Sequence, residues 1–586
     1  LVAGGPVIAE LLEDAPEAQV LATSREPLRV YGERELPVGP LTLADPGAGT
    51  TAAAVAGSEA VRLFVTRARD RKPDFALTDQ NAAAVAEICA RLDGLPLAIE
   101  LAAARVHLLP PAALLARLER RLALLVDGPR DLPARQQTLR GALDWSHDLL
   151  DPTEQRLFRR LAVFDGGWTI EAAERVIGDG DWIVGPAEVL EGLASLASKS
   201  LLAVDERDNQ PRFRMLGTVR EYARERLVEA GEEPAVGWRH AEHFAALAEE
   251  AEPQLRGSRQ ADWLRRLLLE HENLIAAMRW ALESGQVEPG LRIAGALRWF
   301  WDGRGGAGIA RPLIVALLAR PEAAAPTAPR AAALNTLGIL AADAGEYGQA
   351  ESFFEQSLAI WRRLDDRPQI GYLTNNLGAL AQRRADYATA RRLLEESLAI
   401  KRVAADRRSV AGTLQNIGIV ETLQGDYPAA RRALEESLAE LRATDDRWGI
   451  ANALLYLAWV DLELGELARA RAQLGESLRI WLDLGHTPGT ALALGGCAAA
   501  AVVAGQPELA LRLGGAAAAL CAASEQPLPA ASQEQLDRWL ARARAQVDPA
   551  AAAAAWAAGL ATSPADAIEL AGTSPAAAGS DAQRSC

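Results

Sequence analysis

Residues 94 to 106, GLPLAIELAAARV, place a glycine and a proline at the start of a long apolar run. Pro96 stands where the first turn of a helix would begin, and proline suits that position because its missing N–H would have no partner there. Leu95 and Leu97 are too apolar for an ordinary exposed helix start. The segment therefore allows two interpretations, a helix start packed into a core and a proline that faces a ligand.

Residues that could bind a metal or act as nucleophiles are scattered through the rest of the chain. His240 and His243 stand three residues apart, a spacing that a metal site could use, but no third ligand is nearby, so we expect a solvated helix face. The cysteines form no CxxC pair, which predicts reduced and mostly buried thiols. They are Cys89, Cys497, Cys521 and Cys586. We therefore predict no catalytic residue and no metal ligand.

The composition disfavours several classes of partner. The net charge of −16 and the pI of about 5.1 make the chain as a whole a poor binder of nucleic acid, because acidic proteins repel phosphate backbones. The sequence holds no GxxxxGK[ST] motif to cradle phosphates. It also lacks a convincing membrane span and the basic start of a signal peptide, so we expect a cytoplasmic protein without a membrane partner. Since the chain begins with Leu1 and not with Met, we expect a fragment of a longer protein.

The elements that would position these residues change in type along the chain. PVIAELLEDAP predicts an amphipathic helix, while AQVLATSRE (18–26) and ERELPVGPL (33–41) predict two strands, so the start resembles part of a parallel sheet. Helices follow to about residue 125, with Ser58 and Thr78 as expected N-caps. Further helices and the strand–turn–strand pattern LLAVDERDNQPRFRML then predict a winged helix.

From about residue 331 the sequence repeats itself every 40 residues. Glycines recur at 338, 378 and 418, where we expect two helices to approach closely, and alanines recur at 350, 390, 430 and 470, where the second helix crosses the first. A glycine or alanine at 345, 385, 425 and 465 is expected to end the first helix. This pattern predicts a stack of helix–turn–helix repeats of the tetratricopeptide type, with a concave face for partners.

We therefore predict a mainly α fold: the remnant of an α/β nucleotide-binding domain, a helical domain, a winged helix and an α-solenoid. The expected regions are 1–50 (the last part of a nucleotide-binding core), 51–125 (the helical domain with the GLPL motif), 126–232 (the winged helix), 233–325 (a helical linker), 326–525 (the repeats) and 526–586 (an Ala-rich, partly disordered tail, with one or two helices within 551–572).

Two of these segments together resemble the NB-ARC type of STAND ATPase. LATSRE near the start and GLPL about 70 residues later stand in the order that this family uses. The resemblance implies that Arg25, with Thr23 and Ser24 beside it, contacts the nucleotide γ-phosphate, which an arginine can do by a charge-assisted bidentate contact. It also implies that Pro96, after Gly94, lies against the adenine, where a flat ring without a donor suits stacking.

The segment ALDWSHDLLDPTEQRLFRRLAVFDGGWTIEAAE is similar to the winged helix of actinobacterial STAND regulators, where this domain is a packing module. Relatives in plants and animals carry a Met-His-Asp motif near its end, and this chain has Met215, Leu216 and Gly217 instead. A histidine contact to the β-phosphate is therefore not expected.

The resemblance implies a signal-transducing ATPase that regulates transcription. ATP or ADP with Mg²⁺ would bind to the full-length protein, and we expect no tight nucleotide binding to this chain, because the phosphate-binding loop and the Mg²⁺-binding strand of the family come upstream of a sequence like residues 1–16. DNA would be contacted only through a missing N-terminal domain. The repeats would sense a protein or a small molecule on their concave face, and a nucleotide-dependent oligomer is the expected assembly. The alternative is a non-enzymatic tetratricopeptide scaffold for protein binding.

Overall fold

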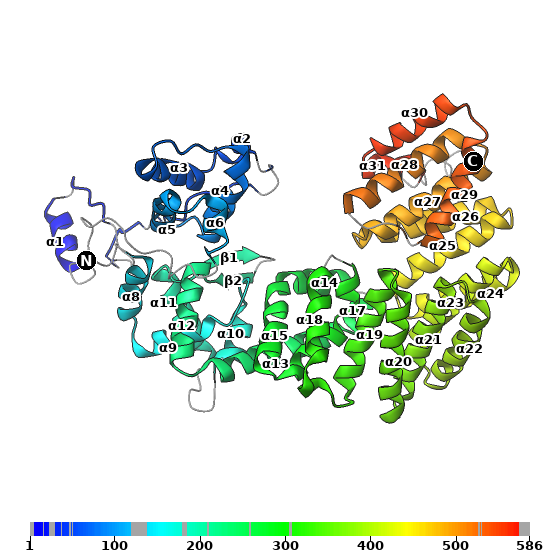
Figure 1. Cartoon of the computed structure of the whole chain (residues 1–586), viewed down its shortest axis with the longest axis horizontal. Coiled ribbons are helices and arrows are strands. Elements are labelled where there is room, and N and C mark those ends of the chain that lie inside the picture. The colour runs from blue at the N-terminus through cyan, green and yellow to red at the C-terminus, as the bar shows by residue number, and fades with distance from the viewer. Residues whose placement is uncertain are drawn as a thin grey trace. The chain divides into compact units, whose positions relative to one another are not determined.

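The computed structural model describes residues 5–15, 17–22, 28, 30–34, 36, 38–45, 49, 51–118, 138–178, 185–207, 210–256, 259–303, 307–524, 528 and 530–572. The chain forms two compact units (Figure 1). Unit 1 comprises Leu1–Phe244 and Leu269–Trp280, and unit 2 comprises Ala245–Leu268 and Ala281–Cys586. Helices dominate the described residues of both units, as the sequence predicts.

The first fifty residues contain helix α1 (Gly5–Asp14), in agreement with the predicted amphipathic helix. The two predicted strands are wrong for the described residues, because 18–22, 33–34, 36 and 38–41 are not in strands. A strand needs a neighbour to pair its backbone groups, and none of the described residues supplies one. Leu21 is 96% exposed and Val38 is 93% exposed, so neither enters a core.

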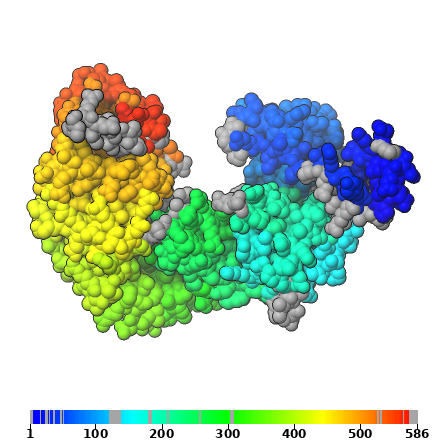
Figure 2. All heavy atoms as spheres, turned by 180° about the vertical axis from the view of Figure 1, so that it is seen from behind, coloured from blue at the N-terminus to red at the C-terminus, as the bar shows by residue number. Residues whose placement is uncertain are grey.

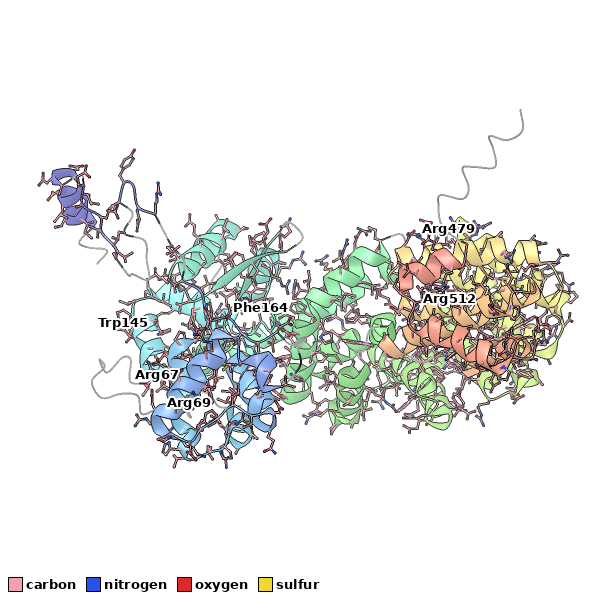
Figure 3. The ribbon with its side chains drawn as sticks, turned by 90° about the horizontal axis from the view of Figure 1, so that it is seen from above. Arg67, Arg69, Trp145, Phe164, Arg479 and Arg512 are labelled. Carbon is pink, nitrogen blue, oxygen red and sulfur yellow. The ribbon has the colours of Figure 1, made fainter. Side chains whose placement is uncertain are left out.

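The helical domain of unit 1 is built from short helices with clear start signals. Its helices are α2 (Ala52–Val55), α3 (Glu59–Arg71), α4 (Asp79–Arg91), α5 (Pro96–Ala103), the 3₁₀ helix η3 (Ala104–His107) and α6 (Pro111–Leu115). Ser58 caps α3 as predicted, with its hydroxyl accepting from the backbone N–H of Val61. Phe64 of α3 is fully buried and packs edge-on against Phe75. Arg67 of α3 donates to Glu100 of α5 at 3.0 Å, which ties these two helices together (Figure 3).

The winged-helix region follows the predicted order. It contains α8 (Leu139–Asp148), α9 (Pro152–Leu161), α10 (Ile170–Ile177), α11 (Pro186–Ser198), β1 (Ala203–Arg207), β2 (Gln210–Arg214) and α12 (Gly217–Glu229). The strands pair antiparallel, with Val204 opposite Phe213. In the core, Phe164 stacks on Trp168 with ring centroids 5.2 Å apart (Figure 3). Both side chains come from the turn between α9 and α10. Since the backbone of Trp168 also pairs with that of Phe213 in β2, this turn joins the helices to the hairpin.

The next helices lead to the repeats and are divided between the two units. They are α13 (Glu233–Ala251), η6 (Gln254–Arg256), α14 (Gln260–Leu269), α15 (His271–Ser284), α16 (Val287–Ala296), α17 (Arg298–Gly303), α18 (Ala307–Ala319) and η7 (Pro321–Ala323).

The repeats of unit 2 are pairs of helices of nearly equal length. The pairs are α19 (Ala328–Asp343) with α20 (Tyr347–Arg363), α21 (Arg367–Arg383) with α22 (Tyr387–Val403), α23 (Arg407–Gln424) with α24 (Tyr427–Ala443), α25 (Arg447–Glu463) with α26 (Leu467–Asp483), and α27 (Thr487–Val503) with α28 (Pro507–Ser524). Figure 2 shows them, from green through yellow to orange, as one continuous body. The predicted solenoid is confirmed.

Both predicted glycine roles are present in the repeats. A Cβ at Gly338 would lie 2.4 Å from the Phe354 ring, so the small residue allows the close helix crossing. Gly345, Ala385, Gly425 and Gly465 all adopt the left-handed backbone conformation that ends the first helix of a pair. A serine in the second helix of the first four pairs adds a further contact: Ser357 Oγ, for example, donates to the carbonyl of Ala331 at 2.7 Å.

The Ala-rich tail forms α29 (Ala530–Arg544), α30 (Pro549–Leu560) and α31 (Pro564–Leu570), and the last two confirm the one or two helices predicted for residues 551–572. Gly515 of α28 and Gly559 of α30 let these helices cross closely, since a Cβ at Gly559 would lie 2.2 Å from the carbonyl oxygen of Arg512. The tail therefore packs on the last repeat up to residue 572, and the end predicted to be disordered lies outside the described residues.

Candidate functional sites in the two units

The residues predicted to contact a nucleotide are described only in part. Thr23, Ser24 and Arg25 lie outside the described residues, so their predicted role at the γ-phosphate stays a prediction. Gly94 and Pro96 are described, and both lie at the junction between α4 and α5.

The local backbone requires a glycine at position 94. Its backbone is left-handed, with φ at +67°, and its carbonyl accepts a hydrogen bond from the Leu41 N–H at 3.0 Å. A Cβ at this position would lie 2.4 Å from the Leu41 carbonyl oxygen, so only glycine fits. The backbone of residues 38–45 is thus attached to the helical domain here, and this contact alone explains the glycine.

Pro96 is the first residue of α5 and its side chain is exposed. The predicted helix start is therefore confirmed, while the ring remains accessible for stacking. The helix itself is shorter than the sequence suggests, because it changes to the 3₁₀ helix η3 at Ala104.

Asp93 connects the GLPL segment to the end of the winged helix. Its carboxylate accepts from the backbone N–H of Thr218 at 3.1 Å, in the first turn of α12. That helix has Leu216 as N-cap, which offers no capping side chain, so Asp93 satisfies one of the unpaired N–H groups and complements the helix dipole. The structure therefore brings Gly94 next to Met215–Gly217. The sequence analysis does not predict the contact made by Asp93. The available signal is Leu216, an apolar N-cap that leaves the first N–H groups of α12 to be bound by a side chain from another segment.

The described residues fit a nucleotide only on the adenine side. The exposed ring of Pro96 suits a base, but the N-terminus of α12, which could otherwise hold a phosphate, is already bound by Asp93. No phosphate contact can be derived from the described part of this junction.

The winged helix is poorly suited to DNA. The helix before its hairpin, α11, exposes Glu188 and Glu191, and Lys199 beyond the end of α11 donates to Glu154 at 2.5 Å. On the hairpin, the guanidinium of Arg212 is buried against Glu270. Exposed acids on the helix that would enter a groove repel phosphates, so the geometry favours the predicted packing role.

Arg212 belongs to a buried polar joint in unit 1, made with Glu270 and Asn273. Arg212 Nη1 donates to Glu270 Oε1 at 2.5 Å, and Asn273 Nδ2 donates to Glu270 Oε2 at 2.8 Å. Asn273 Nδ2 also donates to the carbonyl of Gly167, and its Oδ1 accepts from the backbone N–H of Asp165 at 2.8 Å. This joint holds α15 against the hairpin and the turn after α9.

His240 corrects the prediction of a solvated face. Its side chain is 1% exposed and lies among the rings of Phe164 and Phe244, because α13 packs this face against the winged helix. Burial, with a smaller contribution from the charge of His243, lowers the pKa of His240 to about 3 against a weak opposing contact with Asn273. The imidazole is therefore neutral at physiological pH. The described residues contain no cluster of three or more potential metal ligands.

Two of the cysteines match their prediction. Cys89 and Cys497 are buried and free, and burial raises the pKa of each to about 12, so both remain thiols. Among the described helices, none is long and apolar enough to cross a membrane.

Asparagines form a row along the first helices of the repeats. Asn376 Nδ2 donates to Asn335 Oδ1 at 2.8 Å, and Asn416 Nδ2 donates to Asn375 Oδ1 at 3.1 Å. Asn335 is buried and the other three asparagines are half-buried, so the row joins neighbouring repeats and exposes only part of its amides, which carry both donors and acceptors.

Comparisons with known proteins match the winged-helix region and the repeats. A family model for a winged helix-turn-helix domain matches residues 150–228, and one for the tetratricopeptide repeat matches 329–402 and 409–483. A protein named "Putative HTH-type transcriptional regulator" from Mycobacterium tuberculosis is 41% identical over 298 residues, which cover 51% of this chain and 32% of that protein. A counterpart in Mycobacterium bovis matches equally. The chain thus spans about a third of the length of these relatives.

Other similarities are weaker. An uncharacterized protein of Mycobacterium tuberculosis is 38% identical over 238 residues, covering 41% of this chain and 57% of that protein. A solved STAND protein with a tetratricopeptide repeat sensor, from Pyrococcus horikoshii, has a TM-score of 0.41 and 14% identity, covering 83% of this chain and 72% of that one. At this TM-score the likeness does not establish a common fold. The matched domains show that the chain combines a winged helix-turn-helix domain with a tetratricopeptide array.

Proposed function

We propose that this chain is the switch and sensor part of a nucleotide-dependent transcriptional regulator. The observation that carries the proposal is the 41% identity to the HTH-type regulators, together with the winged helix followed by tetratricopeptide repeats. In the full-length protein, ATP or ADP with Mg²⁺ would bind next to Pro96, and DNA would be bound by a domain that this chain does not contain. The repeats would bind the signal.

The contact between Asp93 and Thr218 supports the switch. It connects the segment expected at the adenine to the start of α12, so a nucleotide that moved the GLPL segment would also move the winged helix. A switch needs such an element, in which two arrangements differ by a few contacts.

Two prolines at the same helix position provide a test on the full-length protein. Pro96 begins α5 with an exposed ring, and Pro111 begins α6 in a buried position. We expect Pro96→Ala to weaken ATP and ADP binding alike, by about tenfold, because it removes a stacking surface for the shared base. Pro111→Ala should leave both affinities unchanged. Unchanged binding in Pro96→Ala, measured by calorimetry, would remove the adenine-side role.

Arg25 allows a second test that separates the two nucleotides. A sensor of the γ-phosphate contacts ATP and not ADP, so Arg25→Ala should weaken the response to ATP more than the response to ADP. Equal losses for the two nucleotides would count against this role.

The second candidate function is a protein-binding scaffold without nucleotide switching. It is favoured by the asparagine row, which offers a binding surface independent of any nucleotide. A full-length protein that binds neither ATP nor ADP but still binds a protein partner through the repeats would favour this alternative.

A further inference from the structure

A cleft of about 560 Å³ lies within unit 2, between the linker helices and the repeats. The charged side chains and the tyrosine that line it come from the turn after α13, from α17, from α21 and from the start of α23. These residues are Glu252, Arg298, Tyr372, Asp406, Arg407 and Arg408. The volume falls within the range of about 300–1,000 Å³ that is usual for small-molecule sites.

The repeats themselves show that this place is unusual. At the position of Lys401 in the second helix, three of the other pairs carry the buried residues Trp361, Leu441 and Trp481, and the last pair carries the half-buried Cys521. Lys401 is only 3% exposed, and its ammonium donates to Thr413 Oγ1 at 2.8 Å. Burying an amine is costly, and a repeat that only had to stack would be at least as stable with an apolar residue. The departure from the repeat therefore points to a role other than stacking.

The polar group extends from Lys401 to the cleft. Lys401 Nζ lies 5.0 Å from the ring centroid of Tyr372, and the Tyr372 hydroxyl donates to Asp406 Oδ2 at 3.0 Å. Ser409 donates from its hydroxyl to that of Tyr372 and from its backbone N–H to Asp406. Tyr372 and Asp406 are thus held in place at the wall of the cleft, which is the preorganisation that a binding site needs.

The ionisation of Asp406 is set by the same contacts. Burial by itself would raise the pKa of this carboxyl, but the hydrogen bonds from Ser409 and Tyr372 and the charge of Lys401 together lower it. Asp406 is therefore a carboxylate at neutral pH, and its charge is balanced within the protein.

The arginines of the cleft retain donors for a ligand. Arg298 donates to Glu252 at 2.6 Å, Arg407 donates to Glu440 at 2.6 Å, and Arg408 donates to the carbonyl of Thr444 at 3.2 Å. A guanidinium has five N–H groups, so these bonds occupy only part of each. Planar guanidinium groups bind carboxylates and phosphates in pairs of hydrogen bonds. The wall residues include three arginines and two carboxylates, and Arg407 and Arg408 are also paired with Glu440 and Asp446, so a ligand would be bound by the remaining N–H donors.

We propose that this cleft binds a small anionic metabolite with a carboxylate or phosphate group, held by Arg298 of the linker and Arg407 of the repeats, with Tyr372 on its polar body. Such a ligand would join α17 to α23. Its role as the signal of the regulator rests on the proposed function, while its binding does not.

The test is a titration of the 586-residue chain with citrate, which carries only carboxylates, and with glycerol 3-phosphate. We expect at least one to bind at about millimolar affinity or better, and Arg407→Ala to weaken that binding by about tenfold or more, which corresponds to roughly 1.4 kcal/mol. Arg407 forms a surface pair and is 62% exposed, so its removal should not unfold the chain.

The repeats provide a matched control. Arg447 occupies the same position one repeat later and pairs with Asp483 at 2.7 Å, but it does not line the cleft. The Arg447→Ala variant should therefore bind citrate and glycerol 3-phosphate with the same affinity as the unchanged chain. Equal losses in Arg407→Ala and Arg447→Ala would indicate unspecific attraction and overturn the proposal.

The two probes also decide the chemistry. Binding of citrate alone assigns a carboxylate ligand, and binding of glycerol 3-phosphate alone assigns a phosphate ligand. If neither binds at about 10 mM, or if only an acidic peptide binds in an Arg407-dependent manner, the small-anion site is overturned. Because no nucleotide takes part, these results stand even if the full-length protein proves not to bind ATP, and that failure would remove only the role as a signal.

Discussion

The repeats and the winged-helix region are held together in different ways. In the repeats the same contact recurs every 40 residues: Ser357, Ser397, Ser437 and Ser477 each donate to the carbonyl 26 residues earlier, at 2.7–2.8 Å. In the winged-helix region, Arg212, Glu270 and Asn273 form a buried joint that is made once. The comparison indicates that the array distributes its stability over many equivalent contacts, while the winged helix depends on a few buried polar groups.

The largest expected effect comes from breaking the buried joint. Glu270→Ala leaves the Arg212 guanidinium buried without its carboxylate, so we expect a loss of about 3–5 kcal/mol in the free energy of unfolding of unit 1. The control in the array is Glu435→Ala, which removes the exposed pair with Arg469 and should cost about 0–1 kcal/mol. Urea unfolding followed by circular dichroism measures both. Similar losses in the two variants would contradict the distinction between the regions.

Within the array, a close helix crossing can be broken by one methyl group. Gly338→Ala would place a Cβ 2.4 Å from the buried ring of Phe354, and the resulting overpacking should destabilise the protein by about 1–3 kcal/mol. Gly412 lies inside α23 with no atom near an added Cβ, so Gly412→Ala should stabilise by about 0.5–1 kcal/mol. Opposite shifts in the melting temperature are expected, and a shift of the same sign in both would show that the crossing is not tight.

The buried histidine makes unit 1 sensitive to acid. Because the pKa of His240 is about 3 in the folded protein and about 6.5 when unfolded, the unfolded chain binds an extra proton between these values. Stability should therefore fall as the pH falls from about 6.5 towards about 3, by about 2 kcal/mol at pH 5.

The measurement compares unfolding at about pH 7.5 and about pH 5. His240→Gln should lose this pH-dependent difference, whatever its effect on stability at neutral pH. His107→Gln, which removes an exposed imidazole, serves as the control and should keep it. A wild-type protein equally stable at both pH values would refute the buried neutral imidazole.

The smallest effect concerns the turns of the array. Ala385 adopts a left-handed backbone with φ at 60°, where Gly345, Gly425 and Gly465 stand in the other pairs. Since this conformation strains an L-residue, Ala385→Gly should stabilise by about 0.5–1 kcal/mol. Gly425→Ala should destabilise by a similar amount. A lower melting temperature for Ala385→Gly than for the unchanged protein would show that the backbone at Ala385 is not strained.

The features that the sequence predicts well are those that depend on local signals. The cap at Ser58, the glycine at 338 and the turns at 345 and 385 all follow from residue types within a few positions. The repeats make these signals stronger, because each one recurs in register. The fold of the array could therefore be predicted almost completely.

The features that the sequence predicts poorly depend on what packs against a segment. The strands expected near the start need partners that the described residues do not provide, and the spacing of His240 carries no information about Phe164 and Phe244, which surround it. The contact of Asp93 with Thr218 joins residues 125 positions apart. The cleft at Tyr372 was indicated only by a lysine in a position that other repeats fill with apolar side chains.

The most direct test of the proposed regulator is the affinity for ATP and ADP of residues 1–586 and of the full-length protein, measured side by side by calorimetry. The account predicts tight nucleotide binding by the full-length protein and none by residues 1–586 alone, because the described residues offer a base one surface, Pro96, and no phosphate contact. Affinity at about the micromolar level for residues 1–586, or no binding by the full-length protein, would contradict it.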